Sequence, residues 1–221
     1  MKILVSWSSG KDSAWMLHVL HRELPGAPAA LLTTVAEAYD RVAMHGVRTS
    51  VLGAQAQAAD LPLYTVDIPS PCSNEIYEDR MGAAVQRALA EGFTHVAFGD
   101  LFLEDVRRYR EERLAGTGLQ PLFPLWGKPT AALAQEMVVA GLEARLTCVD
   151  PRMLPADMAG RRFDRELLAE LPAGVDPCGE RGEFHTCVLA GPMFSRRIDV
   201  DVGACVERDG FVFADLSLQV E

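Results

Sequence analysis

The stretch from residue 2 to residue 13, K-I-L-V-S-W-S-S-G-K-D-S, carries side chains that could bind a phosphate group. From Ser6 onward it gathers hydroxyl donors, one cation and one acid: Ser6, Ser8, Ser9, Lys11, Asp12 and Ser13. Gly10 lies among them and permits backbone angles that a side chain would forbid. The chemistry that these residues predict is the binding of a phosphate chain.

Two elements must hold this stretch in place. The apolar run from Ile3 to Val5 is bounded by turn signals and predicts a core strand. Residues 14–23 carry apolar side chains at helical spacing and predict a helix. A helix that begins directly after a loop presents unpaired N–H groups and the positive end of its dipole. We therefore predict a binding site for an anion at the start of this helix.

A Walker A loop does not explain the pattern. That motif requires a glycine five positions before its Gly-Lys pair and a Ser or Thr directly after the lysine. Here the two positions hold Val5 and Asp12. The stretch instead resembles the S-G-G-K-D-S loop of the N-type ATP pyrophosphatases, which cleave ATP between the α and β phosphates. Ser9 stands where that loop usually has its first glycine.

This resemblance implies that the loop binds the pyrophosphate part of ATP. The implied nucleotide-binding residues are Ser6, Ser8, Ser9, Gly10, Lys11, Asp12 and Ser13. Lys11 would stabilise the charge that develops on the departing pyrophosphate. Asp12 would be a Mg²⁺ ligand, directly or through water.

The rest of the first half alternates between strand and helix patterns. Further strands are predicted over 29–35, 62–68 and 95–101, and further helices over 48–61, 74–91 and 103–114. Strands that alternate with helices form a parallel sheet with helices on both faces. We therefore expect an α/β, Rossmann-like fold.

In such a sheet, ligands bind at the carboxyl ends of the strands. Thr33, with Thr34 beside it, lies near this end of the second strand, and Gly99 with Asp100 ends the fourth. We expect Thr33, Gly99 and Asp100 to lie near the nucleotide. His45 falls in a polar loop near the same edge, and we expect it to be exposed to solvent.

The sequence changes character in its second half. A proline-punctuated apolar run, L-Q-P-L-F-P-L-W-G at 119–127, predicts the crossing between two domains. We expect an ATP-binding domain over 1–120 and a smaller α+β substrate domain over 121–221.

Within this smaller domain, two segments predict β-strands, 184–190 and 195–202. The dipeptide Asp209-Gly210 then predicts a hairpin turn.

A second group of chemistry-bearing residues lies at 176–186, D-P-C-G-E-R-G-E-F-H-T. Gly179 and Gly182 alternate there with Glu180 and Glu183, ahead of a predicted strand. Glycines let the backbone turn sharply and approach a ligand. Two carboxylates three residues apart could bind a cationic group, a metal or ammonia, or could act as acid and base.

Four motifs together resemble the diphthine–ammonia ligase family, also described as the ATP-binding domain family of diphthamide synthesis enzymes. They are S-S-G-K-D-S at 8–13, G-D-L-F-L-E-D-V-R-R-Y-R-E at 99–111, L-Q-P-L-F-P-L-W at 119–126 and C-G-E-R-G-E-F-H-T at 178–186. Arg181 stands where the family commonly has a glycine. The resemblance covers nearly the whole chain.

The resemblance implies site residues in both halves of the chain. The implied substrate-binding residues are Glu104, Arg107, Cys178, Gly179, Glu180, Gly182, Glu183, His185 and Thr186. Catalytic roles are implied for Lys11, Asp12 and Glu183. The implied reaction uses ATP and Mg²⁺: ATP activates a carboxylate as the acyl-adenylate with loss of pyrophosphate, and ammonia then displaces AMP to leave an amide.

The identity of the carboxylate is left open. Diphthine is a modified histidine on the translation elongation factor of archaea and eukaryotes. An Ala- and Arg-rich chain with three lysines is typical of GC-rich bacterial genomes. In a bacterium the substrate could differ, and a cobalamin-related carboxylate is one example.

Composition limits the partners further. The net charge of −10 argues against binding to nucleic acid or to an anionic membrane. No stretch approaches the roughly 20 apolar residues that span a bilayer. Five scattered cysteines without a C-x-x-C pair predict reduced thiols. Because the start of the sequence has no signal-peptide pattern, we expect a cytoplasmic protein. The expected partners are ATP or AMP, ammonia and a carboxylate that is either protein-bound or a small molecule. A homodimer is left open.

Two other functions compete with the ligase interpretation. One is a tRNA-modifying enzyme with the same kind of loop, although paired cysteines and a basic stripe are both missing from the sequence. The other is a non-catalytic module that senses ATP or AMP. Release of pyrophosphate from ATP distinguishes the ligase from such a sensor.

Overall fold

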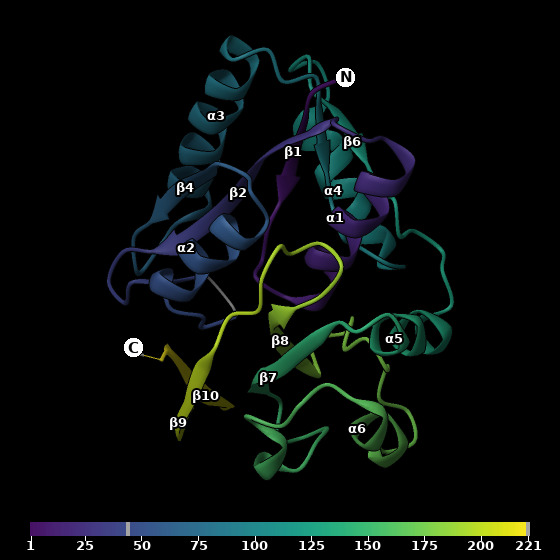
Figure 1. Cartoon of the computed structure of the whole chain (residues 1–221). Helices are drawn as coiled ribbons and strands as arrows, with labels where there is room; N and C mark the ends of the chain where they lie inside the picture. Colours follow the sequence, from purple (N-terminus) through teal and green to yellow (C-terminus); the bar gives the residue numbers. More distant parts are fainter. Residues whose placement is uncertain (43–44, 220–221) are drawn as a thin grey trace.

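The computed structural model describes residues 1–42 and 45–219, which form two β-sheets with helices packed against them (Figure 1). The strands are β1 (Ile3–Ser6), β2 (Pro28–Ala36), β3 (Arg41–Val42), β4 (Leu63–Ile68), β5 (His95–Ala97), β6 (Gln120–Leu122), β7 (Glu143–Val149), β8 (Phe184–Ala190), β9 (Val200–Arg208) and β10 (Phe211–Leu218). The helices are α1 (Lys11–Glu23), α2 (Thr49–Ala58), α3 (Asn74–Ala90), α4 (Glu104–Leu114), α5 (Thr130–Val139), the 3₁₀ helix η1 (Ala156–Met158) and α6 (Arg165–Glu170).

The first sheet has the strand order β4-β2-β1-β5-β6, and all of these pairs are parallel. The short β3 pairs antiparallel with the end of β2. The chain order of the parallel strands reverses at β1, which is the topological switch point of a doubly wound sheet. The predicted α/β, Rossmann-like fold is confirmed.

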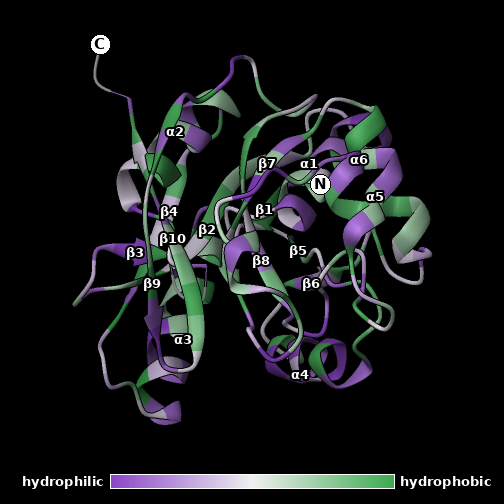
Figure 2. Cartoon of the chain, turned by 90° about the horizontal axis from the view of Figure 1, so that it is seen from below, coloured by the Kyte–Doolittle hydropathy of each residue, from purple (hydrophilic) through white to green (hydrophobic). Residues whose placement is uncertain are grey.

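Alternate residues of β1 face two different apolar clusters. Ile3 and Val5 pack in a large cluster with residues of α1 and α2, whereas Leu4 packs in a smaller one with residues of α3 and α4. Because side chains alternate along a strand, helices must cover both faces of this sheet. Helix α4 is mainly hydrophilic, in contrast to the apolar strand β10 (Figure 2).

The second sheet is antiparallel, with the order β8-β7-β10-β9. β9 and β10 form the predicted hairpin, and its turn residues Asp209 and Gly210 both have positive φ angles, 53° and 80°. Two positive φ angles are what a type I′ hairpin turn requires. The hairpin prediction is therefore confirmed.

The structure differs from the sequence-based prediction at several segments, among them the short β3 and η1, which were not predicted. The strand predicted over 95–101 ends at Ala97. A strand not predicted, β6, lies within the proline-punctuated run. The strand predicted over 195–202 begins only at Val200, because Ser195 donates its backbone N–H to Ala58 and not to a strand neighbour.

The two sheets share one apolar core. The large cluster includes Ile3 of β1, Leu146 of β7 and Leu216 of β10. Gln55 on α2 is fully buried between them: its side-chain amide donates to the backbone oxygens of Ser9 and Val188 at 3.0 and 2.7 Å. A satisfied buried amide of this kind fixes one relative position of the two sheets.

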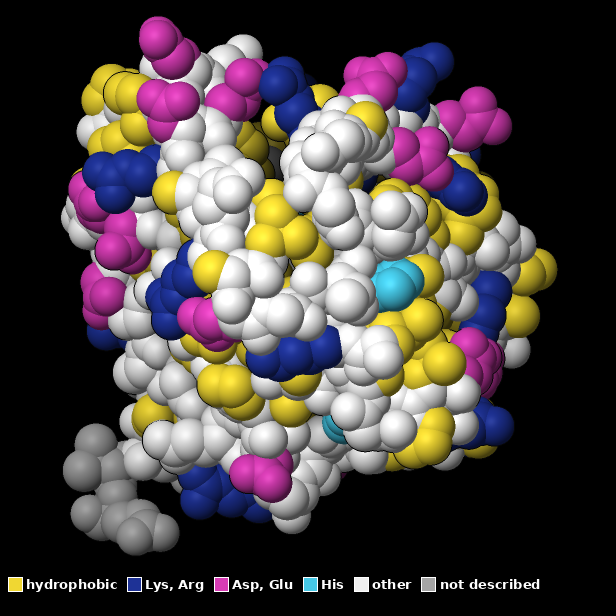
Figure 3. Space-filling view, turned by 90° about the horizontal axis from the view of Figure 1, so that it is seen from above, with side chains coloured by type: hydrophobic (Ala, Val, Ile, Leu, Met, Phe, Trp, Pro, Cys, Tyr) yellow, Lys and Arg dark blue, Asp and Glu magenta, His cyan; other side chains and the backbone are white. Residues whose placement is uncertain are grey.

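The predicted domain division at 120/121 falls inside β6, the last strand of the first sheet, and it stays a prediction. Among the described residues, every helix is too short or too polar to cross a lipid bilayer. On the face shown in Figure 3, side chains of Lys and Arg are interspersed with those of Asp and Glu and form no continuous basic stripe.

Candidate active site

The phosphate-binding stretch lies at the carboxyl end of β1, at the switch point of the sheet. Helix α1 begins at Lys11, so Lys11 and Asp12 belong to its first turn. The N-cap residue is Gly10, which has no side chain to cap the helix. The amides of Asp12 and Ser13 therefore have no partner inside the helix. They can bind an anion, and the helix dipole favours one there.

Serine hydroxyls hold the loop in its curved shape. Ser13 Oγ accepts the backbone N–H of Ser8 at 3.3 Å and donates to the Gly10 oxygen at 3.0 Å. Ser8 Oγ lies 3.2 Å from Ser13 Oγ. These bonds position both hydroxyls at the cavity in front of α1. There they could donate to a phosphate oxygen, and a hydrogen bond to a charged oxygen is stronger than one between two neutral hydroxyls.

Ser9 adopts a backbone conformation that favours glycine. Its φ is +69°, in the left-handed region, and the residue is fully buried. Its backbone oxygen accepts the N–H of Val188 in β8 at 2.9 Å. Within residues 1–42 and 45–219, its hydroxyl has no hydrogen-bond partner. The loop therefore keeps the geometry of a glycine at this position although a serine occupies it.

Lys11 is buried, with 2 % of its side chain exposed. Its ammonium donates to Asp12 Oδ2 at 2.8 Å and to the backbone oxygen of Cys178. Burial alone would lower the pKa of Lys11, but Asp12 and the other nearby negative groups outweigh it and raise that pKa above its usual value. Lys11 is thus a permanent cation at the cavity wall.

The second motif forms a tight turn in front of β8. Asp176 accepts the backbone N–H of Cys178 at 2.8 Å. Glu183, which is 2 % exposed, accepts the backbone N–H groups of Asp176 and Arg181, both at 2.9 Å. Gly179 has φ +66°, and a Cβ there would lie 2.7 Å from the Phe184 oxygen. The turn therefore depends on two buried carboxylates and one glycine.

This turn directs Glu180 into the cavity. Its Oε1 accepts the backbone N–H of Leu101 at 2.8 Å. Burial, together with the charge of Asp12, raises the pKa of Glu180 to about 7. A carboxyl group with such a pKa can take up and release a proton near neutral pH. In contrast, burial raises the pKa of the Cys178 thiol to about 12, so that this cysteine is a poor nucleophile.

Gly99 and Asp100 follow β5 on the opposite side of α1. A Cβ on Gly99 would lie 3.0 Å from the Asp12 carbonyl carbon and 3.1 Å from the Ser13 nitrogen, so the backbones can approach only at a glycine. Asp100 accepts from the Arg110 guanidinium at 2.6 Å, and that guanidinium lies 4.5 Å from the Phe98 ring centre. The ion pair fixes Arg110 at the cavity rim.

Two histidines, His45 in the turn after β3 and His185 in β8, meet at the cavity wall. The rings of His45 and His185 lie 4.6 Å apart, and His45 Nδ1 is 3.1 Å from the Thr186 oxygen. Burial lowers the pKa of His45 to about 3 and that of His185 to about 4. Both rings are therefore neutral at pH 7. The expectation that His45 is exposed to solvent is wrong: the residue is half-buried, because its ring packs against His185 and the Thr186 oxygen of β8.

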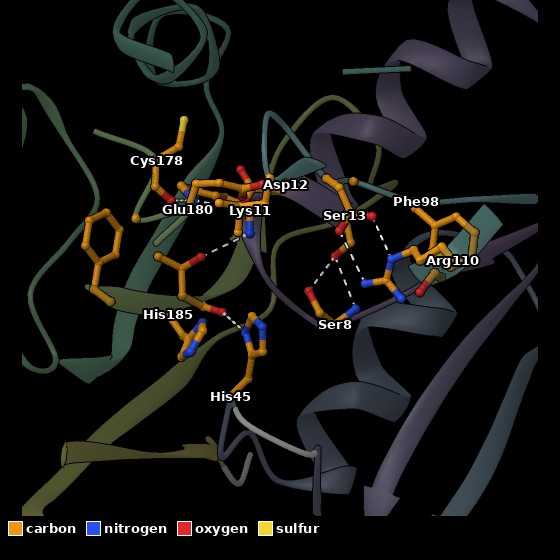
Figure 4. A pocket seen from close by; sticks show the side chains of 17 residues that line it. Ser8, Lys11, Asp12, Ser13, His45, Phe98, Arg110, Cys178, Glu180 and His185 are labelled. Atoms are coloured by element: carbon orange, nitrogen blue, oxygen red, sulfur yellow. Dashed lines mark hydrogen bonds and ion pairs between the residues drawn. The ribbon is translucent and has the colours of Figure 1, made fainter. Parts of the chain in front are cut away.

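These groups surround one cavity of about 230 Å³ (Figure 4). Lys11, Asp12, Cys178 and Glu180 lie at one end of it, and Ser8, Ser13, Phe98 and Arg110 at the other. The predicted site residues that line it are Ser6, Ser8, Lys11, Asp12, Ser13, Gly99, Asp100, Cys178, Gly179, Glu180, His185 and Thr186. The cavity thus combines a phosphate loop from the first sheet with an acidic turn from the second.

The other predicted site residues lie outside the cavity lining. Thr33 donates its hydroxyl to the Trp7 backbone oxygen at 2.8 Å. Ser9 and Gly10 form the side of the loop that faces away from the cavity. Glu183 holds the turn, and Gly182 lies beside it. Glu104 is exposed on α4. Arg107 lies 4.8 Å from the ring centres of both Phe123 and Trp126. Their proposed roles in binding or catalysis stay predictions.

Comparison with known proteins points to one family. A profile described as the diphthamide synthase C-terminal domain matches residues 129–214. Diphthine–ammonia ligase of Schizosaccharomyces pombe is 29 % identical over 219 residues, 90 % of this chain and 36 % of the relative. The Bos taurus protein of that name is 30 % identical over 178 residues, 73 % of this chain and 66 % of the relative. The Danio rerio protein is 38 % identical over 118 residues, 51 % of this chain and 46 % of the relative.

The chain belongs to the diphthine–ammonia ligase family. Membership confirms the resemblance drawn from the four motifs. The chain spans from about a third to two thirds of the length of these curated relatives.

Sequence reasoning missed several cavity residues of this family member. They are His45, Phe98, Leu103, Arg110 and Phe184. For Arg110 a signal was present, since it lies in the motif at 99–111 and three residues after Arg107 on one face of α4. The apolar residues carried no such signal, because nothing in their type separates a cavity wall from a core.

Proposed function

We propose that this chain joins ammonia to a carboxylate by way of an acyl-adenylate, converting ATP to AMP and pyrophosphate. One observation carries the proposal: Lys11 at the open N-terminus of α1 faces Glu180, a carboxyl group with a pKa of about 7, inside a single cavity. The Lys11 ammonium can stabilise the negative charge of a departing pyrophosphate, and the Glu180 carboxylate can accept the proton of an attacking amine. The diphthine–ammonia ligase relatives support the same chemistry by their name.

The nucleotide would extend from this cavity into a neighbouring one. A cavity of about 340 Å³ adjoins the first and shares Ser6, Ser8 and Phe98 with it. Trp7 and Thr34 at the carboxyl ends of β1 and β2 also line it. Phosphates at the start of α1 and adenosine in the adjoining cavity would together use the edge of the sheet where ligands of this fold class bind.

Asp12 fits a role in holding Mg²⁺. Within residues 1–42 and 45–219, its Oδ1 atom is buried without a hydrogen-bond partner, and no group of three or more acidic, His or Cys side chains could hold a metal ion. Mg²⁺ is commonly held by one or two carboxylates, with phosphate oxygens and water completing the shell. When bound, the ion would neutralise phosphate charge.

The proposed steps follow from the groups in the cavity. A carboxylate oxygen attacks the α-phosphorus of ATP, the bond between this atom and the bridging oxygen breaks, and pyrophosphate leaves with the electron pair. Lys11 and the amides of α1 stabilise that charge. The ammonia nitrogen then attacks the acyl carbon, and AMP leaves with its oxygen. Glu180, in its ionised form, accepts the proton that the nitrogen loses.

The substrate that we propose first is diphthine, which the names of the relatives supply. The GC-rich bacterial composition keeps a cobalamin-related carboxylate as the second candidate. Glu183 is proposed to hold the turn that presents Glu180, since its carboxylate is occupied by two backbone amides.

The test measures AMP and pyrophosphate release from ATP in the presence of Mg²⁺ and ammonium. The substrates are an elongation factor that carries diphthine and a panel of small carboxylates. The expected result is equal release of AMP and pyrophosphate that depends on one carboxylate. Tight ATP binding without pyrophosphate release from any substrate would contradict the proposal and favour a nucleotide sensor.

Lys11→Met is the matched variant for this assay. Methionine keeps most of the apolar stem, so the fold is expected to persist while the positive charge is lost. Removing one prepositioned charge donor typically lowers kcat by about 10²–10³-fold. Unchanged ATP affinity and unchanged turnover in this variant would show that Lys11 does not bind the nucleotide.

A further inference from the structure

His45 lies where the two cavities of the proposed nucleotide site meet, since it lines both of them. One is the cavity in front of α1, which contains the phosphate loop. The other is lined by Trp7 and Thr34 at the carboxyl ends of β1 and β2. In a nucleotide whose phosphates occupy the first cavity and whose base occupies the second, the ribose must lie between them. His45 therefore lies beside the position of the ribose.

The ring of His45 is packed closely against the phosphate loop. A Cβ on Gly10 would lie 2.8 Å from Cε1 of His45, so a side chain at residue 10 would displace the ring. The ring also packs against His185, with 4.6 Å between the ring centres. These two contacts hold the imidazole beside the start of α1, within reach of a ligand bound there.

A charged cluster holds the backbone on both sides of His45. Asp215 of β10 accepts from Arg41 at 2.9 Å and, through both of its oxygens, from Arg48 at 2.9 and 2.6 Å. Arg41 also donates to the backbone oxygen of Gly46, directly after His45, at 2.7 Å. A bidentate pair between a guanidinium and a carboxylate fixes geometry as well as charge. Asp215 thus positions His45 from the second sheet.

The hydrogen bond of His45 determines what its ring can recognise. Nδ1 lies 3.1 Å from the Thr186 backbone oxygen, which can only accept, so Nδ1 carries the ring proton (Figure 4). Burial lowers the pKa of His45 to about 3, so at pH 7 the ring is neutral and Nε2 is an acceptor. Within residues 1–42 and 45–219, no donor is paired with Nε2. An acceptor of this kind suits a hydroxyl group and does not suit an ionised phosphate oxygen.

We propose that Nε2 of His45 accepts a hydrogen bond from a ribose hydroxyl group and makes the site selective for ribonucleotides over deoxyribonucleotides. The assignment rests on the proposed function, which places phosphates and adenosine in the two cavities. A nucleotide without this hydroxyl leaves the acceptor unpaired, which lowers its affinity. Asp215 is a positioning residue: it lines neither cavity and acts through Arg41 and Arg48.

The test measures the affinity of the full chain for ATP, 2′-deoxy-ATP, 3′-deoxy-ATP and inorganic pyrophosphate. Calorimetric titration with Mg²⁺ and without a carboxylate substrate needs no turnover. At least one deoxy analogue is expected to bind about tenfold more weakly than ATP, or weaker still. In His45→Phe, which keeps a flat ring and removes both nitrogens, that analogue is expected to bind within about threefold of ATP. Pyrophosphate, which reports on the phosphate loop alone, is expected to bind equally well to both proteins.

His18→Phe is the matched control. His18 is also half-buried, and its ring centre also lies 4.6 Å from an aromatic ring, that of Trp15. It lines neither cavity of the proposed nucleotide site. All four affinities are therefore expected to be the same in His18→Phe as in the unmodified chain.

Equal affinity of the unmodified chain for ATP and both deoxy analogues would overturn the proposal, and so would a preference for ATP that persists in His45→Phe. If His45→Phe fails to fold or loses pyrophosphate binding, Asp215→Ala replaces it. The preference for ATP should then fall at least threefold while pyrophosphate binding is retained, and an unchanged preference would overturn the proposal. Pyrophosphate release without ribose selectivity contradicts only this assignment, whereas ribose selectivity without release contradicts only the ligase reaction.

Discussion

At the residue scale, Ser9 is the position where the chain departs from the loop that it resembles. A glycine at this position would lose more conformational entropy on folding than a residue with a side chain, which costs roughly 0.5–1 kcal/mol of stability. Against this, a left-handed non-glycine residue costs about 1–2 kcal/mol, and a buried unsatisfied hydroxyl about 1–3 kcal/mol. The strain and the lone hydroxyl outweigh the entropy.

Ser9→Gly should therefore raise the free energy of unfolding by about 1–4 kcal/mol, since it removes both the strain and the hydroxyl at the cost of the glycine entropy. Urea denaturation measures the change. Ser9→Ala is the matched control: it removes the hydroxyl and keeps the strain, so it should stabilise less. A lower free energy of unfolding for Ser9→Gly would mean that the hydroxyl has a partner in the folded protein.

Glu180 should determine the pH dependence of amide formation. A base must be ionised to accept a proton, so the rate at constant free ammonia should rise as pH increases through about 7, the pKa of Glu180. In Glu180→Gln this rise should disappear and the rate should fall by about 10²–10⁴-fold.

Glu183→Gln is the comparison variant in the same assay: its side chain can accept only one of the two backbone N–H groups that the Glu183 carboxylate holds, so the rate should fall, but Glu180, the group that titrates, is retained. Its rate should keep the rise near pH 7. The measurement is amide formation between about pH 5.5 and pH 8.5 with saturating ATP. A pH profile that changes in Glu183→Gln and not in Glu180→Gln would reverse the two roles.

At the element scale, the central elements of the first sheet could be predicted because their patterns are strong. β2 and β4 are apolar runs between turn signals, and α3 has helical spacing. β6 was missed because Pro121 argues against a strand, yet β6 is the edge strand, where a missing N–H costs little. β5 ends early because Gly99 must pass close to α1.

The candidate site could be predicted only in part, because part of it is consecutive in sequence and the rest is assembled by the fold. The loop from Ser8 to Ser13 carries its chemistry in consecutive residues, so sequence alone indicates it. In the second motif, the sequence does not say which carboxylate faces the ligand. That depends on a turn in which Glu183 binds backbone amides and Glu180 enters the cavity. Arg110 acquires its position only when α4 folds back on the segment after β5, where Asp100 and Phe98 hold its guanidinium.

Gly99→Ala tests the close approach between the β5 loop and α1. The added Cβ would press on the backbone of Asp12, so the start of α1 must shift. Overpacking of this kind typically costs about 1–3 kcal/mol, and we expect ATP affinity to fall about tenfold or more. Calorimetric titration and urea denaturation measure the two effects.

Gly53→Ala in α2 is the control for this substitution. Its Cβ meets no heavy atom within 4 Å, so it should stabilise the protein by about 0.5–1 kcal/mol and leave ATP affinity unchanged. If Gly99→Ala binds ATP as tightly as the unmodified chain, the amides of α1 do not define the phosphate site.

At the scale of the whole molecule, the cavity exists only because the two sheets are locked together. Thr186 of β8 accepts the backbone N–H of Lys11 at 3.0 Å, and Val188 donates to Ser9 at 2.9 Å. The second sheet thus supplies both the acidic turn and the bonds that hold the phosphate loop. His45 and His185 lie at this same junction, next to Lys11.

This histidine pair predicts how stability depends on pH. Both folded-state pKa values, about 3 and about 4, lie below the unfolded value of 6.5, so the unfolded chain binds more protons between pH 6.5 and pH 4. The stability contributed by the neutral rings is present above pH 6.5 and is lost as pH falls toward 4.

In the double variant His45→Asn, His185→Asn, the fall in free energy of unfolding between about pH 6.5 and pH 4.5 should become shallower. Two protons correspond to a slope of at most about 2.7 kcal/mol per pH unit, which sets the upper limit of the difference. Urea denaturation across this range measures both slopes. Equal slopes would show that the two rings are protonated as readily in the folded protein as in the unfolded chain, and hence that the junction between the sheets admits water and charge.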